Sequence, residues 1–109
     1  MSPQYLYVIC EQSDGPRPVK IGFSAEPNKR LKQLQTGHSS PLVLFHKEAV
    51  PFENVRALEK LIHKELKHHK ARGEWFQISP EDAVLEIKHA LIRYGDIENL
   101  PNVLRSGNI

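Results

Sequence analysis

The fold is decided by two short runs of residues, Tyr5-Leu6-Tyr7-Val8-Ile9 and Val19-Lys20-Ile21-Gly22-Phe23. Both runs consist mainly of aromatic, aliphatic and β-branched side chains, which are typical of half-buried strands. Between them lie Ser13-Asp14-Gly15-Pro16 and Pro18, whose backbone preferences are those of a turn. The pattern therefore predicts an antiparallel β-hairpin near the start of the chain.

The hairpin sorts its residues into two sets, because side chains alternate between the two faces of a strand. The apolar set, which we expect over the core, contains Leu6, Val8, Val19, Ile21 and Phe23. The opposite set contains Tyr5, Tyr7, Lys20 and Gly22. Tyrosine and lysine side chains beside a bare glycine backbone favour a functional site. An amphipathic hairpin with a solvated outer face explains the same pattern equally well from the residues alone.

End signals and apolar spacing predict helices over residues 27–35, 53–70 and 80–95, a strand over 42–50, and a short extended segment over 73–78. Trp75 and Phe76 are expected to close the core. We therefore expect an α+β fold in which a small antiparallel sheet of three or four strands is flanked by three helices. The domain is expected to cover residues 1–94, followed by a C-terminal tail over 95–109.

The composition is that of one globular domain, with 109 residues of which 39% are hydrophobic. No apolar run approaches the ~20 residues that a membrane-spanning helix needs, and the N-terminus lacks a signal-peptide pattern. Cys10 is the single cysteine, so no intrachain disulfide can form, and its place in a predicted strand indicates a core residue. These features predict a cytoplasmic protein.

The net charge of the chain is small, but its basic residues are clustered in one segment. The net charge is +2 at pH 7, but residues 56–72 contain many of the lysines, arginines and histidines. Such a run is compatible with a surface that faces nucleic-acid phosphates. An ordinary solvated helix can carry the same run, and the residues alone do not separate the two interpretations.

Two charged residues are expected at the margins of buried helix faces. Arg30 lies about 40° around the helix axis from Leu34, where it can pair with an acid or hold a phosphate. Glu59 lies about 50° from the centre of an apolar stripe. A carboxylate there needs a partner, because burying an unpaired charge is costly, and Arg30, Lys20 or a divalent cation can supply it. His63 lies on the same flank, as a hydrogen-bonded structural residue or, less favoured, as a metal ligand.

The order Tyr-Leu-Tyr, Lys-Ile-Gly, a helix-borne arginine and a helix-borne glutamate resembles the GIY-YIG nuclease superfamily. Four segments resemble in particular a subgroup associated with phages and bacteria, and these segments are Lys20-Ile21-Gly22-Phe23-Ser24, Arg30-Leu31, Gln33-Leu34-Gln35-Thr36-Gly37 and Gly73-Glu74-Trp75-Phe76. Members of that subgroup are often described simply as DNA-binding. The resemblance covers roughly Tyr5 to Ala90.

The resemblance implies hydrolysis of a DNA phosphodiester bond. By similarity, Tyr7 activates a water molecule, Arg30 holds the scissile phosphate, and Glu59 binds one Mg²⁺ or Mn²⁺ that stabilises the leaving oxygen. Two positions depart from the pattern, because Tyr5 replaces the usual first glycine and Lys20 replaces the first tyrosine of YIG. An ammonium near Tyr7 favours the tyrosinate, so Lys20 can assist Tyr7 or can only bind a phosphate.

Three hypotheses follow for the function. The first is a small metal-dependent DNA endonuclease that uses Tyr7, Lys20, Arg30 and Glu59. The second is a DNA-binding module of the same fold that cuts weakly or not at all. The third is an interaction or dimerisation domain without nucleic acid, and a homodimer remains open in every case. Retention of the tyrosine, arginine and glutamate together favours the first. Gln77 is the nearest candidate for the late polar residue of the superfamily.

Overall fold

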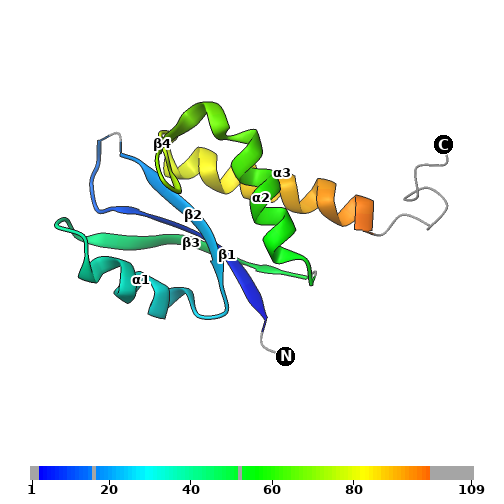
Figure 1. The fold of residues 1–109 in the computed structure, drawn as a ribbon, viewed down its shortest axis with the longest axis horizontal. Helices are drawn as coiled ribbons and strands as arrows, with labels where there is room; N and C mark the ends of the chain where they lie inside the picture. The colour runs from blue at the N-terminus through cyan, green and yellow to red at the C-terminus, as the bar shows by residue number, and fades with distance from the viewer. Residues whose placement is uncertain (1–2, 16, 52, 99–109) are drawn as a thin grey trace.

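The computed structural model describes residues 3–15, 17–51 and 53–98, which form an α+β fold (Figure 1). Its three α-helices are α1 (Pro27–Thr36), α2 (Val55–Glu65) and α3 (Pro80–Glu98), and a single 3-10 turn, η1 (Lys67–His69), follows α2. Its five strands are β1 (Gln4–Glu11), β2 (Val19–Ser24), β3 (Leu42–Val50), β4 (Lys70–Arg72) and β5 (Trp75–Phe76). The expected α+β class with three helices is confirmed.

The sheet is antiparallel and has the strand order β3-β1-β2-β5-β4. Five strands replace the three or four that the sequence predicts, because the second helix ends much earlier than expected. Leu66 is the last buried residue of its apolar stripe, and the exposed residues after it give another helical turn nothing to bury. The chain instead forms η1 and β4, and Gly73, at φ 56°, turns it back into β5.

The sheet has an apolar cluster on each face, as the alternation of β1 and β2 predicts. On one face α2 and α3 cover Leu6, Val8, Cys10, Val19, Ile21 and Phe76. On the other face α1 covers a smaller cluster built on Tyr7, Ile9 and Leu42, with Leu31, Leu34 and Trp75 packed against it. The outer face of the hairpin is therefore not solvated, and that alternative is wrong.

Helix α3 begins as its sequence predicts but runs past its expected end. The backbone N–H of Asp82 donates to Ser79 Oγ at 3.0 Å, and Pro80 occupies the first helical position. The helix continues through Gly95 to Glu98, since one interior glycine costs only about 1 kcal/mol relative to alanine. The rest of the predicted tail, residues 99–109, lies outside the described residues, and the domain boundary stays a prediction. Within the described residues no helix is long and apolar enough to span a bilayer.

Tyr7 and Gly22 lie directly opposite each other on β1 and β2, and this contact shapes the α1 face of the sheet. Both residues are buried, and only 2% of Tyr7 is exposed. A Cβ atom at position 22 would lie 2.7 Å from Tyr7 Cζ and closer still to its hydroxyl. The tyrosine ring therefore lies over a backbone position that has no space for a side chain.

The substitution Gly22→Ala should displace the Tyr7 ring and lower the free energy of unfolding by about 1–3 kcal/mol, the usual cost of overpacking. Urea denaturation measures this loss. Gly37→Ala is the matched control, because a Cβ there meets nothing within 4 Å. Equal stabilities of the two variants would contradict the packing that we describe.

Candidate functional site

A shallow cavity of about 300 Å³ opens where β1, β2, α1, α2 and the β4–β5 turn meet. It is lined by Tyr7, Gly22, Phe23, Arg30, Arg56, Glu59, Lys60 and Glu74. Three of the four residues that sequence reasoning selected thus share one cavity, although Tyr7 and Glu59 are far apart in the chain. The fourth, Lys20, reaches the cavity through its contact with Glu74.

The phenol of Tyr7 forms the buried floor of this cavity. Burial raises the pKa of Tyr7 above its ordinary value, because a tyrosinate loses its hydration there. The Arg30 guanidinium opposes this rise through a hydrogen bond and its positive charge, whereas Glu74 and Glu59 add to it. The cation that favours the tyrosinate in this structure is therefore Arg30. Assistance from Lys20 stays a prediction.

Lys20 forms an ion pair with Glu74, a residue to which the sequence assigns no role. Its side chain is almost buried, and Lys20 Nζ lies 2.9 Å from Glu74 Oε1 and 5.9 Å from the ring centroid of Trp75. A buried ammonium needs such a partner, because desolvation without one is costly. The hydrogen bond from Lys20 also lowers the pKa of Glu74, so this carboxylate is ionised at neutral pH.

Glu74 could have been found only through the segment Gly73-Glu74-Trp75-Phe76, which is part of the family resemblance. Hydrophobic spacing does not reveal it, because it lies on the short turn between β4 and β5 and its side chain is half exposed. The pairing of β5 with β2 sets Trp75 opposite Lys20 and so carries Glu74 to the cavity.

Glu59, His63 and Glu74 each bring one potential metal-ligand atom to within 4.8 Å of the others. Glu59 is half-buried, and burial raises its pKa, although the charge of His63 acts in the opposite direction. None of the ion pairs among the described residues involves Glu59. Two carboxylates and an imidazole form a donor set that can hold a divalent metal ion.

His63 forms a hydrogen bond, as expected for the structural role that the sequence favours. This hydrogen bond also orients the imidazole ring. The Nε2–H group donates to the backbone carbonyl of Ile21 at 2.8 Å. In the neutral ring this leaves the Nδ1 lone pair available, which is the arrangement that metal-bound histidines commonly show. The structural and metal-binding interpretations of His63 are therefore compatible.

Two other residues that the sequence analysis named, Gln77 and Trp75, do not line this cavity. Gln77 is exposed and lines a different cavity, together with Asp14 and Arg17 of the β1–β2 turn, so it is not a residue of this site. Trp75 is half-buried and stacks on His38, with ring centroids 5.6 Å apart. It closes the smaller apolar cluster, as the sequence predicts.

Replacing Arg30 by glutamine should raise the pKa of Tyr7 further, because it removes the cation and the hydrogen bond that favour the tyrosinate. An NMR titration of the Tyr7 ring carbon Cζ measures this change. Lys32→Gln removes the same charge from an exposed position on the same helix and should leave the Tyr7 titration unchanged. An identical titration in Arg30→Gln and the wild type would show that Arg30 does not act on the phenol.

A family model described as the T5orf172 domain, which occurs in nuclease-like proteins of phages and bacteria, matches residues 4–91. No curated protein and no solved structure matches the chain. The matched segment contains every residue that lines the cavity, from Tyr7 to Glu74. The chain therefore belongs to the T5orf172 domain family.

Proposed function

We propose that this protein is a GIY-YIG-like DNA endonuclease that hydrolyses phosphodiester bonds with one divalent metal ion. The observation that carries the proposal is the meeting of Tyr7, Arg30 and Glu59 at one cavity. These side chains come from β1, α1 and α2, and each has the chemistry that its proposed role requires. Membership of a family found in nuclease-like proteins supports the same class of reaction.

The cations at the cavity are suited to a phosphodiester. Arg30 is half-buried, and its planar guanidinium can hold two phosphate oxygens at once. Arg56 and Lys60 line the same cavity from α2 and are exposed to an incoming strand. Negative charge accumulates on the phosphate oxygens as the reaction proceeds, so fixed cations that are already in place lower the barrier.

Tyr7 is the proposed base toward the attacking water. Its phenol is neutral at pH 7, and burial raises its pKa further, so loss of the phenol proton depends on the positive charge beside it. Arg30 supplies that charge in the free protein. Gly22 provides the space that the phenol occupies, since a Cβ at position 22 would overlap the hydroxyl, and both residues line the cavity. In this mechanism Tyr7 first releases its own proton to solvent, and the tyrosinate beside Arg30 then takes a proton from water. The water oxygen attacks the phosphorus held by Arg30, and the bond between phosphorus and the leaving oxygen breaks.

Glu59 is the proposed primary ligand of Mg²⁺ or Mn²⁺, with His63 Nδ1 and Glu74 as the other donors. When bound, the ion acts as a Lewis acid that stabilises the leaving oxygen. Glu59 is first in this set because its carboxylate carries a burial cost that no ion pair among the described residues offsets. Glu74 already neutralises Lys20 and is a shared ligand.

The second candidate function is a DNA-binding module that does not cut. One observation favours it, which is that Lys20 stands where the superfamily has a tyrosine and is held by Glu74 rather than by Tyr7. The exposed cations of the cavity would then serve binding alone. The two functions differ in one property, namely the appearance of nicked DNA.

Nicking of supercoiled plasmid in Mg²⁺ or Mn²⁺ tests the proposal. We expect the wild type to nick, and Glu59→Gln to lose at least about 100-fold in rate, a typical effect of losing a group that stabilises the transition state. Glu53→Gln, which changes an exposed glutamate just before α2, is the matched control and should nick normally. Thermal melting checks that Glu59→Gln folds, as the removal of a half-buried charge predicts.

Two results would contradict the nuclease. One is a wild type that never nicks, under any metal or pH, while it still binds DNA in a salt-sensitive way, and this result leaves the binding module. The other is full nicking by a folded Glu59→Gln variant, which would remove the proposed metal ligand from the mechanism.

A further inference from the structure

Exposed cations continue out of the cavity along one side of α2. Arg56 and Lys60 line the cavity, and Lys64 follows at the same spacing of four residues. Four-residue steps keep these three side chains within about 80° of the helix circumference. All three are exposed, and we call them the α2 stripe. On this helix the stripe lies next to the flank that carries His63 and Glu59, and Glu59 lines the cavity.

The three cations of the α2 stripe form no ion pair, unlike four other basic residues of the described chain. Lys20, Lys29, Lys88 and Arg93 each form an ion pair. No ion pair among the described residues involves Arg56, Lys60 or Lys64. Of the acids of α2, Glu59 lines the cavity beside Arg56, whose charge opposes the rise in the Glu59 pKa that burial causes, and Glu65 pairs with Arg93 of α3.

Such an arrangement is unfavourable for the free helix. Like charges four residues apart destabilise a helix by about 0.2–0.5 kcal/mol per pair. A helix surface that is merely solvated usually alternates the signs of its charges instead. Three exposed cations at four-residue spacing, none of them in an ion pair among the described residues, are therefore better explained by an anionic partner that lies along the helix.

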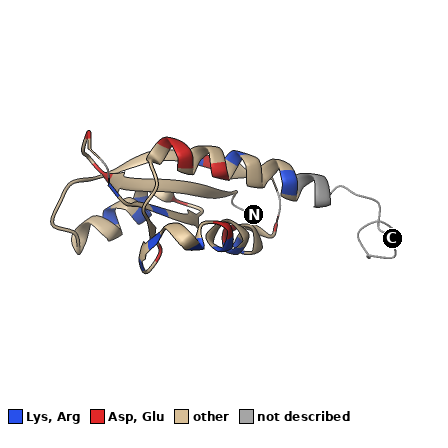
Figure 2. Ribbon diagram, turned by 90° about the horizontal axis from the view of Figure 1, so that it is seen from above, with Lys and Arg blue, Asp and Glu red and all other residues tan. Residues whose placement is uncertain are grey.

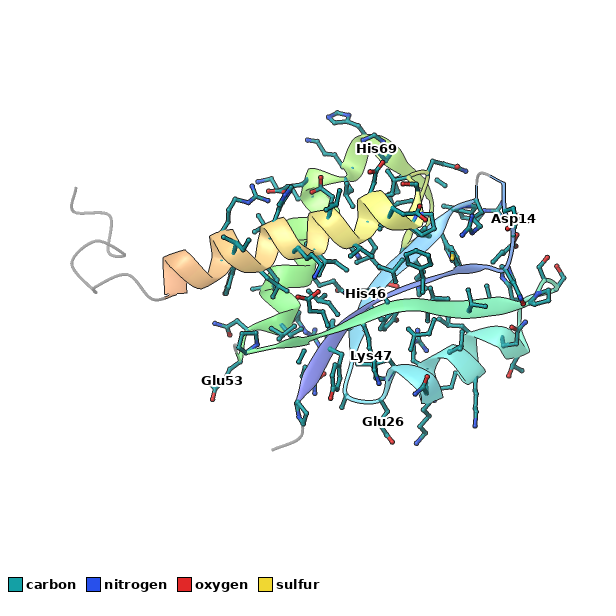
Figure 3. The ribbon with its side chains drawn as sticks, turned by 180° about the vertical axis from the view of Figure 1, so that it is seen from behind. Asp14, Glu26, His46, Lys47, Glu53 and His69 are labelled. Atoms are coloured by element: carbon teal, nitrogen blue, oxygen red, sulfur yellow. The ribbon has the colours of Figure 1, made fainter. Side chains whose placement is uncertain are left out.

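Exposed basic residues continue beyond the C-terminal end of α2, in line with the stripe along the chain. Glu53 lies just before α2, and His69 lies in η1, beyond the other end of that helix (Figure 3). Beyond α2, the basic residues Lys67, Lys70 and Arg72 are exposed on η1 and on the edge strand β4. Charge also differs between helices, because α1 carries only basic charge whereas α3 begins with acidic residues (Figure 2).

We propose that the α2 stripe binds the sugar–phosphate backbone of duplex DNA beside the phosphate held at the cavity. This inference rests on the proposed function, which places that phosphate at Tyr7 and Arg30. From Arg56 to Lys64 the helix rises about 12 Å, which corresponds to three or four base-pair steps of about 3.4 Å. The contacts are to phosphates, so binding depends strongly on salt and little on base sequence.

A duplex fits this surface better than a single strand does. Proteins that bind single strands combine cations with aromatic side chains on which bases stack. Residues 55–72, which form α2, η1 and β4, contain no phenylalanine, tyrosine or tryptophan. The nearby Trp75 is already stacked on His38 and packed against the smaller apolar cluster that α1 covers. Phosphate contacts along a continuous backbone therefore explain the composition of the stripe.

The test measures the affinity for duplex DNA at several salt concentrations by fluorescence anisotropy, with EDTA present so that no cleavage occurs. The double variant Lys60→Gln/Lys64→Gln is compared with Lys88→Gln/Arg93→Gln, which removes the same charge from α3. Each lost phosphate contact should reduce the slope of log K against log salt by about 0.9. We expect a loss of about 1.8 for the α2 pair and of almost nothing for the α3 pair. Lys64→Gln alone, which leaves the cavity lining intact, should lose about half as much as the α2 pair.

The possible failures are distinguishable. If the wild type binds duplex DNA but the two double variants have equal slopes, the stripe does not contact phosphates, and the proposed nuclease is unaffected. If single strands bind more tightly than duplexes and the slope changes only for single strands, the duplex assignment is overturned. If the wild type binds no DNA at all, both this inference and the proposed function fail.

Discussion

The close packing of Tyr7 against the backbone of Gly22 is the constraint on which the site depends. Because position 22 has no side chain, the hydroxyl end of the tyrosine ring can lie against the backbone of β2 while Tyr7 lines the cavity. Helix α1 then packs over the same face through Leu31 and Leu34, and this packing carries Arg30 to the phenol. A side chain at position 22 would move the ring and, with it, the surface on which α1 rests.

The electrostatics of the cavity follow from burial. Desolvation raises the pKa values of Tyr7 and Glu59 and so favours their neutral forms. A nearby cation would stabilise the negatively charged form of each. Lys20 and Glu74 are instead satisfied by each other, at 2.9 Å. The free protein thus holds one neutralised pair beside two groups whose charged forms are disfavoured. This contrast is what we expect of a site that is completed by a divalent cation.

Sequence patterns predicted most of this arrangement where the information is local. Alternation in β1 and β2 placed Tyr7 and Gly22 on one face, and the apolar stripe of α2 placed Glu59 at its edge; both placements agree with the structure. The strand β4 was missed, because three exposed residues after a basic helix carry no periodic signal. Glu74 was missed because its position depends on the pairing of β5 with β2, a contact between distant segments that no local pattern encodes.

The central claim is that Glu59, His63 and Glu74 hold a divalent ion beside Tyr7. Paramagnetic broadening of the amide resonances by substoichiometric Mn²⁺ tests it most directly. The account predicts that broadening is strongest at these three residues and at the neighbouring Tyr7 and Gly22, and that Glu59→Gln abolishes it. Broadening centred on the acidic first turn of α3, at Glu81 and Asp82, or broadening that survives in Glu59→Gln, would contradict the account.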